Sequence, residues 1–223
     1  MFVLIATGVD FVLQILLAAS FAMQWMMLLQ AQETGIDMAT AQANDVRQQI
    51  VSVLVIVAAL VSLVALLVWI YAAHANLPAL GAGKLEFTPG WAVGYFFIPI
   101  VNLWKPFQAV REIHIRSDPD YASGRTQDSA AIVGWWWGLR IVSAIAGRVL
   151  ASGAGPTNTI EGLITLSAAS IFAIVAVDLP LLAVQFLLIQ KVQRFQTQRH
   201  ALVEQQAAAQ PAALSSNPFA ALS

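Results

Sequence analysis

Four charged residues stand inside apolar segments of this sequence, where a charge is costly unless protein or water shelters it. They are Asp10, Arg140, Arg148 and Asp178. Ionisable groups at membrane depth face the bundle interior or a wet cavity, and they pair with one another. Two kinds of chemistry therefore fit these residues: a relay for protons or ions, or ion pairs that fix the register of packed helices. We favour the ion pairs.

No set of residues in the sequence specifies a reaction. The chain has no cysteine and three histidines, none of which has metal-ligand spacing. Neither HExxH nor GxSxG occurs, so the motifs of zinc peptidases and α/β-hydrolases are missing. His74 directly follows an apolar segment, where an interfacial histidine is commoner than a metal ligand. We expect no enzyme, no cofactor and no metal site.

The composition is that of an integral membrane protein. Of 223 residues, 59% are hydrophobic and 10% are charged, against about 25% charged in ordinary soluble domains. The formal net charge of -1 predicts no nucleic-acid partner, because such proteins carry basic patches. The partners that fit this class are the lipid bilayer, a second copy of the chain or another membrane protein.

Apolar segments of membrane-spanning length predict an all-α, four-helix bundle within a membrane domain of residues 1–204. The predicted spans cover about 2–29, 50–73, 129–152 and 159–190. Residues 30–49 are polar, which predicts a loop or a frayed helical extension. The low-complexity residues 205–223 predict a disordered cytoplasmic tail. No basic residue precedes the first apolar run, so we expect the natural start slightly upstream.

Polar residues gather on one side of the first and last predicted spans. Five of them share an arc of about 140° on the first helix: Thr7, Asp10, Gln14, Ser20 and Gln24. In the last span Ser167, Asp178 and Gln185 share one face. These faces should point into the bundle. For Asp10 the alternative is that it reaches the interface, because it lies close to the terminus.

The last span also carries local helix signals. Asn158 followed by Glu161 predicts a capping box, with Asn158 as the N-cap. Pro180 lies inside the span and predicts a kink, because proline cannot donate to the helix ladder.

The stretch 88–116 between the second and third spans is apolar in its first half and charged in its second. Residues 90–104 number 15, which as a helix would be about 22 Å long, short of the ~30 Å hydrocarbon core. Pro99 predicts a break at 98–102, and Pro106 suits the first turn of a second helix. A re-entrant element lining a pocket and an interfacial hairpin both fit, and we favour the hairpin.

Positive charges orient the chain. With four spans and both termini in the cytoplasm, one cation lies outside and eight lie inside. The outer one is Arg47, and the inner ones are Lys84, Lys105, Arg111, Arg116, Arg125, Lys191, Arg194 and Arg199. A fifth span at 90–104 gives the same score, so span length decides for four.

Depth within the bilayer suggests which charges meet. Arg140 and Asp178 both lie about 17 Å from the inner ends of antiparallel spans, at ~1.5 Å per residue. We therefore predict an Arg140–Asp178 ion pair, and a similar approach of Arg148 and Glu161 near the outer face.

Three runs carry a family resemblance: WIYAAHANLPALG at 69–81, FTPGWAVGYFFIPIVNLWKPFQAVREI at 87–113, and GWWWGLRIVSAIAGRV at 134–149. Together they resemble the bacterial domain-of-unknown-function family 4328, from about residue 50 to 194. The resemblance implies a bacterial multi-pass membrane protein and supplies no activity. Its motif residues here would be Trp69, His74, Asn76, Pro89, Gly90, Trp91, Pro99, Asn102, Trp104, Pro106, Arg111 and Glu112. The short N-terminus and the Ala-rich tail depart from the expected form.

Two functions fit these observations. The first, which we favour, is a non-enzymatic scaffold or interaction protein in the bacterial cytoplasmic membrane. The second is a carrier or channel for a small solute or ion, which would use the 88–116 element and the charges at Asp10, Arg140 and Asp178. A water-filled cavity that reaches Asn102 and Arg140 would favour the second.

Overall fold

The computed structural model describes residues 1–121, 130–152 and 159–215, and within these ranges every regular element is helical. The chain divides into two compact units. The first unit contains residues 1–68 and 134–188, and the second contains residues 69–133 and 189–223. Two positions used in the sequence analysis, Arg125 and Asn158, lie outside the described ranges.

Within the described ranges, three helices are long and apolar enough to cross a membrane: Phe2–Thr34, Met38–Ala75 and Ile160–Ala209. They correspond to α1 (Phe2–Thr34), α2 (Met38–Ala75), and the continuous series α6 (Ile160–Ala173), η4 (Ile174–Asp178) and α7 (Leu179–Ser215). The segment expected as the third span forms the 21-residue helix α5 (Ala131–Ala151), which is not among these three helices; it contains two arginines and three tryptophans. The all-α class is confirmed, and three helices meet the requirements for a span.

Of the two alternatives for residues 30–49, the helical extension is the correct one, because residues 35–37 alone are non-helical there. Gly35 ends α1 at a φ of +83°, a conformation that favours glycine. Asp37 caps α2: its Oδ2 accepts hydrogen bonds from the Thr40 hydroxyl and, at 3.0 Å, from the Thr40 N–H. These bonds lower the pKa of Asp37. Two helix-end signals thus outweigh the polarity of 30–49.

At the other end of the chain, α7 continues through Ser215. Residues 205–215 are therefore helical where we expected a disordered tail, and residues 216–223 lie outside the described ranges.

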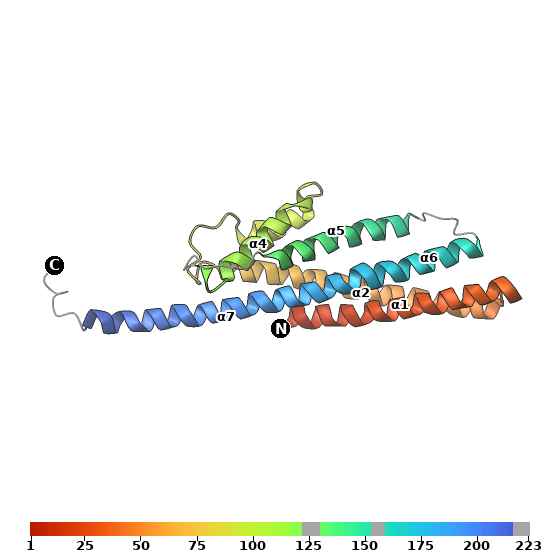
Figure 1. Ribbon diagram of the computed structural model, residues 1–223, viewed down its shortest axis with the longest axis horizontal. Helices are drawn as coiled ribbons and strands as arrows, with labels where there is room; N and C mark the ends of the chain where they lie inside the picture. The colour runs from red at the N-terminus through yellow and green to blue at the C-terminus, as the bar shows by residue number, and fades with distance from the viewer. Residues whose placement is uncertain (122–129, 153–158, 216–223) are drawn as a thin grey trace. The chain divides into compact units, whose positions relative to one another are not determined.

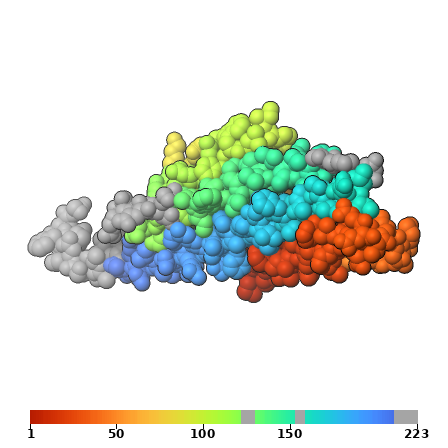
Figure 2. Space-filling model, turned by 45° about the vertical axis from the view of Figure 1, so that its right-hand side comes forward, coloured from red at the N-terminus to blue at the C-terminus, as the bar shows by residue number. Residues whose placement is uncertain are grey.

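In the first unit α1 packs along α6 and η4, as Figure 1 shows for the ribbons and Figure 2 for the side-chain surfaces of α1 and α6. The polar arc of α1 is used in this packing. Gln24 donates to Ser167 Oγ of α6 at 3.1 Å, and Gln48 Nε2 of α2 donates to Gln24 Oε1 at 2.6 Å. Arg47 Nε donates to Ser20 Oγ at 3.2 Å. The expectation that this arc faces protein is confirmed at both Ser20 and Gln24.

The helix that begins at Ile160 widens into a π-helical turn over Ile174–Asp178, just before Pro180. Proline lacks the N–H that an α-helix needs at this position, and it clashes with the carbonyl one turn back. A π-turn accommodates that mismatch and often marks a functional position. The irregularity expected at Pro180 is thus a π-turn, and Asp178 is its last residue.

The N-cap of α6 is Thr159, whose hydroxyl accepts from Gly162 N–H at 3.1 Å. The predicted cap, Asn158, lies one position earlier and outside the described residues. Both are short polar side chains of the kind that satisfy the first N–H groups of a helix, so the sequence places this helix start to within one residue.

The second unit contains the broken stretch 88–116. It folds as α3 (Pro89–Gly94), the 3₁₀ turns η1 (Tyr95–Phe97) and η2 (Val101–Leu103), and α4 (Lys105–Ser117). Thr88 caps α3, with its side chain accepting from Trp91 N–H at 3.3 Å. Ile98 is extended, at φ −98° and ψ 109°, as a residue before proline prefers. The predicted break and the second helix, with Pro106 in its first turn, are confirmed.

Candidate functional site

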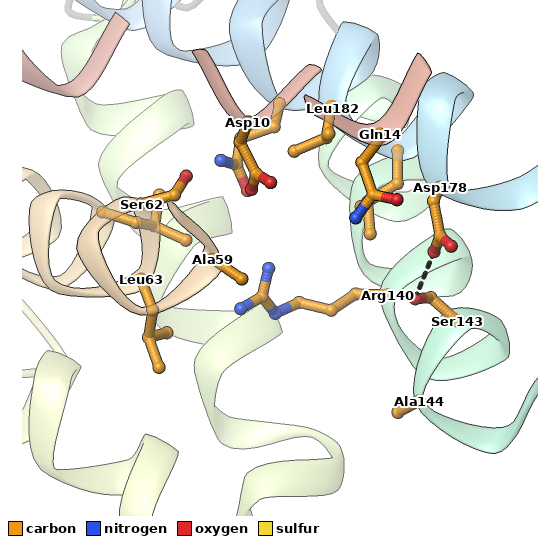
Figure 3. Close-up of a pocket in the computed structure, with 13 residues that line it drawn as sticks. Asp10, Gln14, Ala59, Ser62, Leu63, Arg140, Ser143, Ala144, Asp178 and Leu182 are labelled. Atoms are coloured by element: carbon orange, nitrogen blue, oxygen red, sulfur yellow. Dashed lines mark hydrogen bonds between the residues drawn. The ribbon is translucent and has the colours of Figure 1, made fainter. Parts of the chain in front are cut away.

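A cavity of about 270 Å³ lies in the first unit, lined by residues from α1, α2, α5, η4 and α7. Figure 3 shows side chains from these helices converging on it. Its polar lining residues are Asp10, Gln14, Ser62, Arg140, Ser143, Asp178 and Gln185. The remaining lining residues are alanines and leucines. Three of the four charges singled out in the sequence therefore line one cavity.

Two acceptor atoms on α1 are buried at this cavity without a hydrogen-bond partner. Asp10 is 6% exposed, and its Oδ1 has no partner among the described residues. Gln14 Oε1, one helical turn along, is in the same condition. Asp10 thus faces the interior of the unit, as its place on the polar arc of α1 predicts. Buried polar atoms nearly always have partners, so these two atoms are exceptions among the described residues of this cavity.

Arg140 extends its guanidinium from α5 into the cavity, toward Asp10 (Figure 3). It forms no hydrogen bond or ion pair with any residue that the structure describes. Its neighbours are the Asp10 carboxylate, with which it interacts electrostatically, and the ring of Trp136, whose centroid is 5.9 Å from Cζ. A guanidinium has five N–H donors and no acceptor. The N–H donors of Arg140 thus face the cavity.

Asp178 is held by Ser143, whose hydroxyl donates to Asp178 Oδ1 at 2.6 Å. The predicted Arg140–Asp178 ion pair does not form. Depth counting places two residues at the same height, but it does not fix how each helix is rotated about its axis. Ser143, one turn along α5 from Arg140, takes the position that we assigned to the arginine.

The side of the cavity near Gln185 is fixed by a buried chain of hydrogen bonds. Gln185 is 2% exposed and accepts from Trp136 Nε1–H at 3.2 Å. Its own Nε2 donates to Thr7 Oγ1 at 3.2 Å, and the Thr7 hydroxyl donates to Val3 O at 2.9 Å. This chain ties α1, α5 and α7 together. Elsewhere in the lining the Asp10 carboxylate interacts with Ser62, and Asp10 Oδ1 and Gln14 Oε1 are the two described lining atoms that are buried without a partner.

Arg148 is not a buried charge. Its side chain is exposed, and it lies in the last turn of α5, where a cation favours the helix dipole. The predicted approach to Glu161 yields no ion pair between these two described residues, and Glu161 is likewise exposed.

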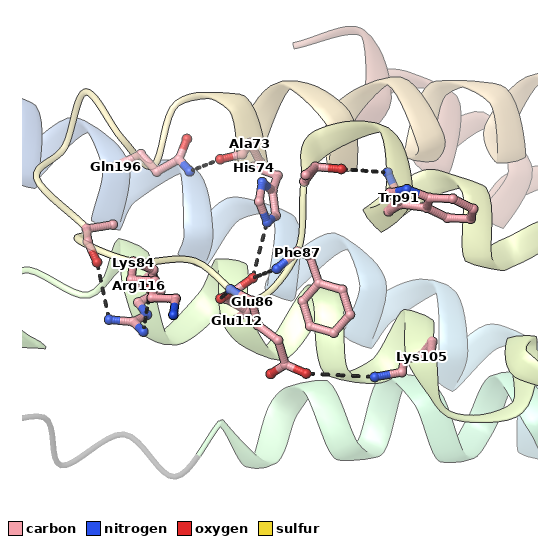
Figure 4. A network of polar contacts seen from close by, with 12 residues as sticks. Ala73, His74, Lys84, Glu86, Phe87, Trp91, Lys105, Glu112, Arg116 and Gln196 are labelled. Carbon is pink, nitrogen blue, oxygen red and sulfur yellow. Dashed lines mark hydrogen bonds and ion pairs between the residues drawn. The ribbon is translucent and has the colours of Figure 1, made fainter.

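In the second unit the family-like residues hold the connector between α2 and α3 (Figure 4). Glu112 of α4 accepts from Glu86 N–H at 2.6 Å and from Phe87 N–H at 3.2 Å. His74 Nε2 lies 3.2 Å from Glu112 Oε2, and His74 is fully buried. The Glu112 carboxylate thus accepts from two backbone N–H groups and contacts the His74 imidazole. We interpret these contacts as structural.

Three further side chains complete this network. The sequence did not predict that they would bind the connector. Arg116 donates to Ala82 O at 3.2 Å and to Lys84 O at 3.0 Å. Arg199 of α7 donates to Leu80 O at 2.7 Å and to Gly81 O at 3.3 Å. Gln196 Nε2 donates to Ala73 O at 2.8 Å, and Gln196 Oε1 accepts from Asn76. Their partners are mostly backbone carbonyls, which leave no signal in a sequence.

The other motif residues build or cover this unit. Trp69 is buried, Pro89 and Gly90 form the first turn of α3, and Pro99 and Pro106 shape the break and the start of α4. Asn102 donates its backbone N–H to Ile98 O at 2.7 Å, but its Oδ1 is buried without a partner. Trp91 and Trp104 are exposed, and Arg111 is exposed at a second, surface cavity. The Asn102 side-chain oxygen therefore forms no hydrogen bond with a described residue at the break, and Asn102 is not among the residues that line the cavity with Arg140.

Among the described residues, no group of three or more His, Asp or Glu side chains is placed to hold a metal ion. The fold and the cavity together define an all-α protein with helices long and apolar enough to cross a membrane. The chain belongs to the family described as "Domain of unknown function (DUF4328)", whose model matches residues 32–197. The resemblance is thereby confirmed, and the match includes Arg140 and Asp178 but not Asp10. No curated protein and no solved structure matches the chain.

Proposed function

We propose that the protein is a multi-pass membrane protein that binds a small polar solute or ion in the cavity of the first unit, as a carrier or channel and not as an enzyme. One observation carries the proposal. Asp10 Oδ1 and Gln14 Oε1 face this cavity without a hydrogen-bond partner among the described residues, and the Arg140 guanidinium extends into it with only the Asp10 charge and the Trp136 ring beside it.

Energetics support the proposal. A buried polar atom without a partner costs about 1–3 kcal/mol, and a charged group costs more. Three such groups at one cavity would be a poor way to build a stable helix bundle, because leucine or alanine at these positions would avoid the cost. Water or a solute in the cavity offsets it. A protein selected for stability alone has no reason to keep Asp10, Gln14 and Arg140 open to one space.

For the setting we propose the bacterial cytoplasmic membrane, with α5 as a fourth crossing beside the three longer helices. α5 supplies the cavity with Arg140 and Ser143, and an arginine that faces a wet cavity is tolerated at membrane depth. The positive-inside rule supports cytoplasmic termini. The broken stretch 88–116 would then lie at the cytoplasmic interface, where its exposed aromatic residues suit the headgroup region.

A scaffold or interaction protein is the second candidate, and one observation in the second unit favours it. Several large apolar side chains of α3 and of the segment between α3 and α4 are exposed: Trp91, Phe97, Ile100, Leu103 and Trp104. The connector that precedes this surface is bound by Glu112 of α4 and by Arg199 of α7. A second copy of the chain or another membrane protein could dock there. Lipid could cover this apolar surface equally well. The surface therefore supports a scaffold less strongly than the cavity supports a solute-binding protein.

The test is access of water to the cavity, and the natural absence of cysteine makes the chain suitable for it. Ala59→Cys on α2 and Ala144→Cys on α5 place thiols on the lining. The matched controls are Val64→Cys on α2 and Val142→Cys on α5, whose side chains are 59% and 48% exposed on the outside of the unit. All four are introduced singly and the protein is reconstituted into lipid vesicles.

Only the thiolate reacts with a small, water-soluble methanethiosulfonate reagent, so a thiol needs water to react. We expect the two cavity cysteines to react and the two outer cysteines, which would face lipid, to stay protected. Protection of all four positions would contradict a solute-binding cavity and move the scaffold to first place.

A further inference from the structure

The cavity presents both signs of charge to its contents. Asp10 and Asp178 contribute two carboxylates, and Arg140 contributes one guanidinium. The Asp178 carboxylate accepts a hydrogen bond from the Ser143 hydroxyl. Asp10 Oδ1 has no partner among the described residues. Arg140 makes no hydrogen bond within the described protein. Figure 3 shows the Asp10 carboxylate and the Arg140 guanidinium reaching into the cavity from α1 and α5.

We propose that the solute is a small zwitterion that carries an ammonium group and a carboxylate, as amino acids do. This inference rests on the proposed function, because it names the ligand class of the same cavity. A simple anion would bind Arg140 but meet the charges of Asp10 and Asp178. A simple cation would bind the carboxylates but meet Arg140. A zwitterion offers a carboxylate to Arg140 and an ammonium group to the two site carboxylates.

Each open group then has a definite role. Arg140 binds the ligand carboxylate through its planar fork of N–H donors, which matches a carboxylate bidentately. Asp10 Oδ1 and Gln14 Oε1 accept hydrogen bonds from the ammonium, which has three donors and no acceptor. Asp178, kept in place by Ser143, adds negative charge on the η4 side of the cavity.

The cavity is large enough for such a ligand. Its volume of about 270 Å³ is several times the ~30 Å³ that one water occupies in the liquid. Leucines and alanines make up the remaining lining, and they suit a short methylene chain between the two charged ends.

The experiment is ligand-dependent thermal unfolding of the full chain in lipid nanodiscs. The probes are glycine, β-alanine and 4-aminobutyrate, which differ in the spacing of their charges, with ethylamine and propionate as analogues that each lack one charge. A ligand that binds only the folded state raises its unfolding temperature. We expect one ω-amino acid to stabilise the protein and both single-charge analogues to have no effect at the same concentration and ionic strength.

Variants test the roles. Arg140→Lys keeps the charge and loses the fork, and it should weaken binding of the stabilising amino acid by at least about tenfold. Gln14→Leu should weaken it less, because Asp10 still binds the ammonium. Val142→Ala, outside the cavity, should leave affinity unchanged. If Arg140→Lys does not fold, Asp10→Asn serves the same purpose from the other end of the ligand.

The outcomes separate this inference from the proposed function. Reactive cavity cysteines with no stabilisation by any ω-amino acid would overturn the zwitterion and leave the solute cavity standing. Stabilisation by ethylamine or propionate equal to that by the amino acids would also overturn it, in favour of a cation or an anion. Unreactive cavity cysteines would remove the proposed function, and the zwitterion with it.

Discussion

His74 Nε2 lies 3.2 Å from Glu112 Oε2, although 38 positions separate the two residues. The contact fixes the end of α2 against α4, and the same carboxylate holds the backbone of residues 86 and 87. Two residues of the family-like motif thus serve to shape a connector. This relationship explains their presence without any catalytic role, and it makes a direct stability prediction.

Glu112→Gln should destabilise the second unit by about 1–3 kcal/mol. Glu112 presents acceptors to two backbone N–H groups and to His74, whereas an amide offers one oxygen and an NH₂ that would face a donor. Thermal unfolding in detergent measures the loss. Glu161→Gln, at an exposed position in the first turn of α6, is the matched control and should change little. Equal stability of the two variants would refute the role assigned to Glu112.

Arg199→Lys should also destabilise the protein, by about 1–3 kcal/mol. The guanidinium donates to carbonyls of the connector at Leu80 and Gly81 and also to Asp118 O, and an ammonium cannot span these acceptors. Arg194→Lys, on the same helix with an exposed side chain, controls for the change of cation. An Arg199→Lys variant as stable as the Arg194→Lys control would show that the bonds contribute nothing.

The absence of an Arg140–Asp178 ion pair makes a prediction about coupling. A double-mutant cycle of Arg140→Gln and Asp178→Asn should give an interaction energy well below the ~3 kcal/mol of a buried ion pair, because the two residues line one cavity but form no direct contact. Asp178→Asn keeps an acceptor for Ser143, so by itself it should cost less than about 1 kcal/mol. Urea unfolding in mixed micelles measures each corner of the cycle. A coupling of about 3 kcal/mol or more would mean that the two charges do pair in a buried site.

The cap of α2 should depend on pH. The pKa of Asp37 is lowered by its hydrogen bonds to Thr40, so the ionised cap stabilises the folded state above the ordinary pKa of 3.8. That contribution is lost as pH falls through the lower folded pKa. The stability advantage of the natural chain over Asp37→Ala should therefore be full near neutral pH and shrink in acid. An advantage that grows toward acid would contradict the assignment.

Much of the architecture could be predicted because its causes are local. Pro99 and Pro106 act on their immediate neighbours, so the break at Ile98 and the start of α4 follow from sequence. The polar arc of α1 predicts that Asp10 faces inward, because helix geometry alone relates Thr7, Asp10 and Gln14. These predictions required no knowledge of tertiary contacts.

The remaining features depend on contacts that a single sequence does not encode visibly. Arg199 and Gln196 bind mainly backbone carbonyls, which every residue type possesses. The partner of Asp178 depends on how each helix is rotated about its axis. Depth counting does not include this rotation, so it predicted Arg140 as the partner where the structure has Ser143. Polar composition left a loop and a helical extension open for 30–49, and the helical extension is correct because Gly35 and Asp37 confine the turn to residues 35–37.

The most direct test of the central claim is a crystal structure grown from a lipid mesophase at a resolution that shows ordered water. The account predicts density for water or a bound solute in the cavity, within hydrogen-bond distance of Asp10 Oδ1 and of the Arg140 guanidinium. It also predicts that Asp178 stays with Ser143. A dry cavity closed by side chains, with Arg140 in a direct ion pair with Asp178, would contradict the claim that this cavity binds a solute.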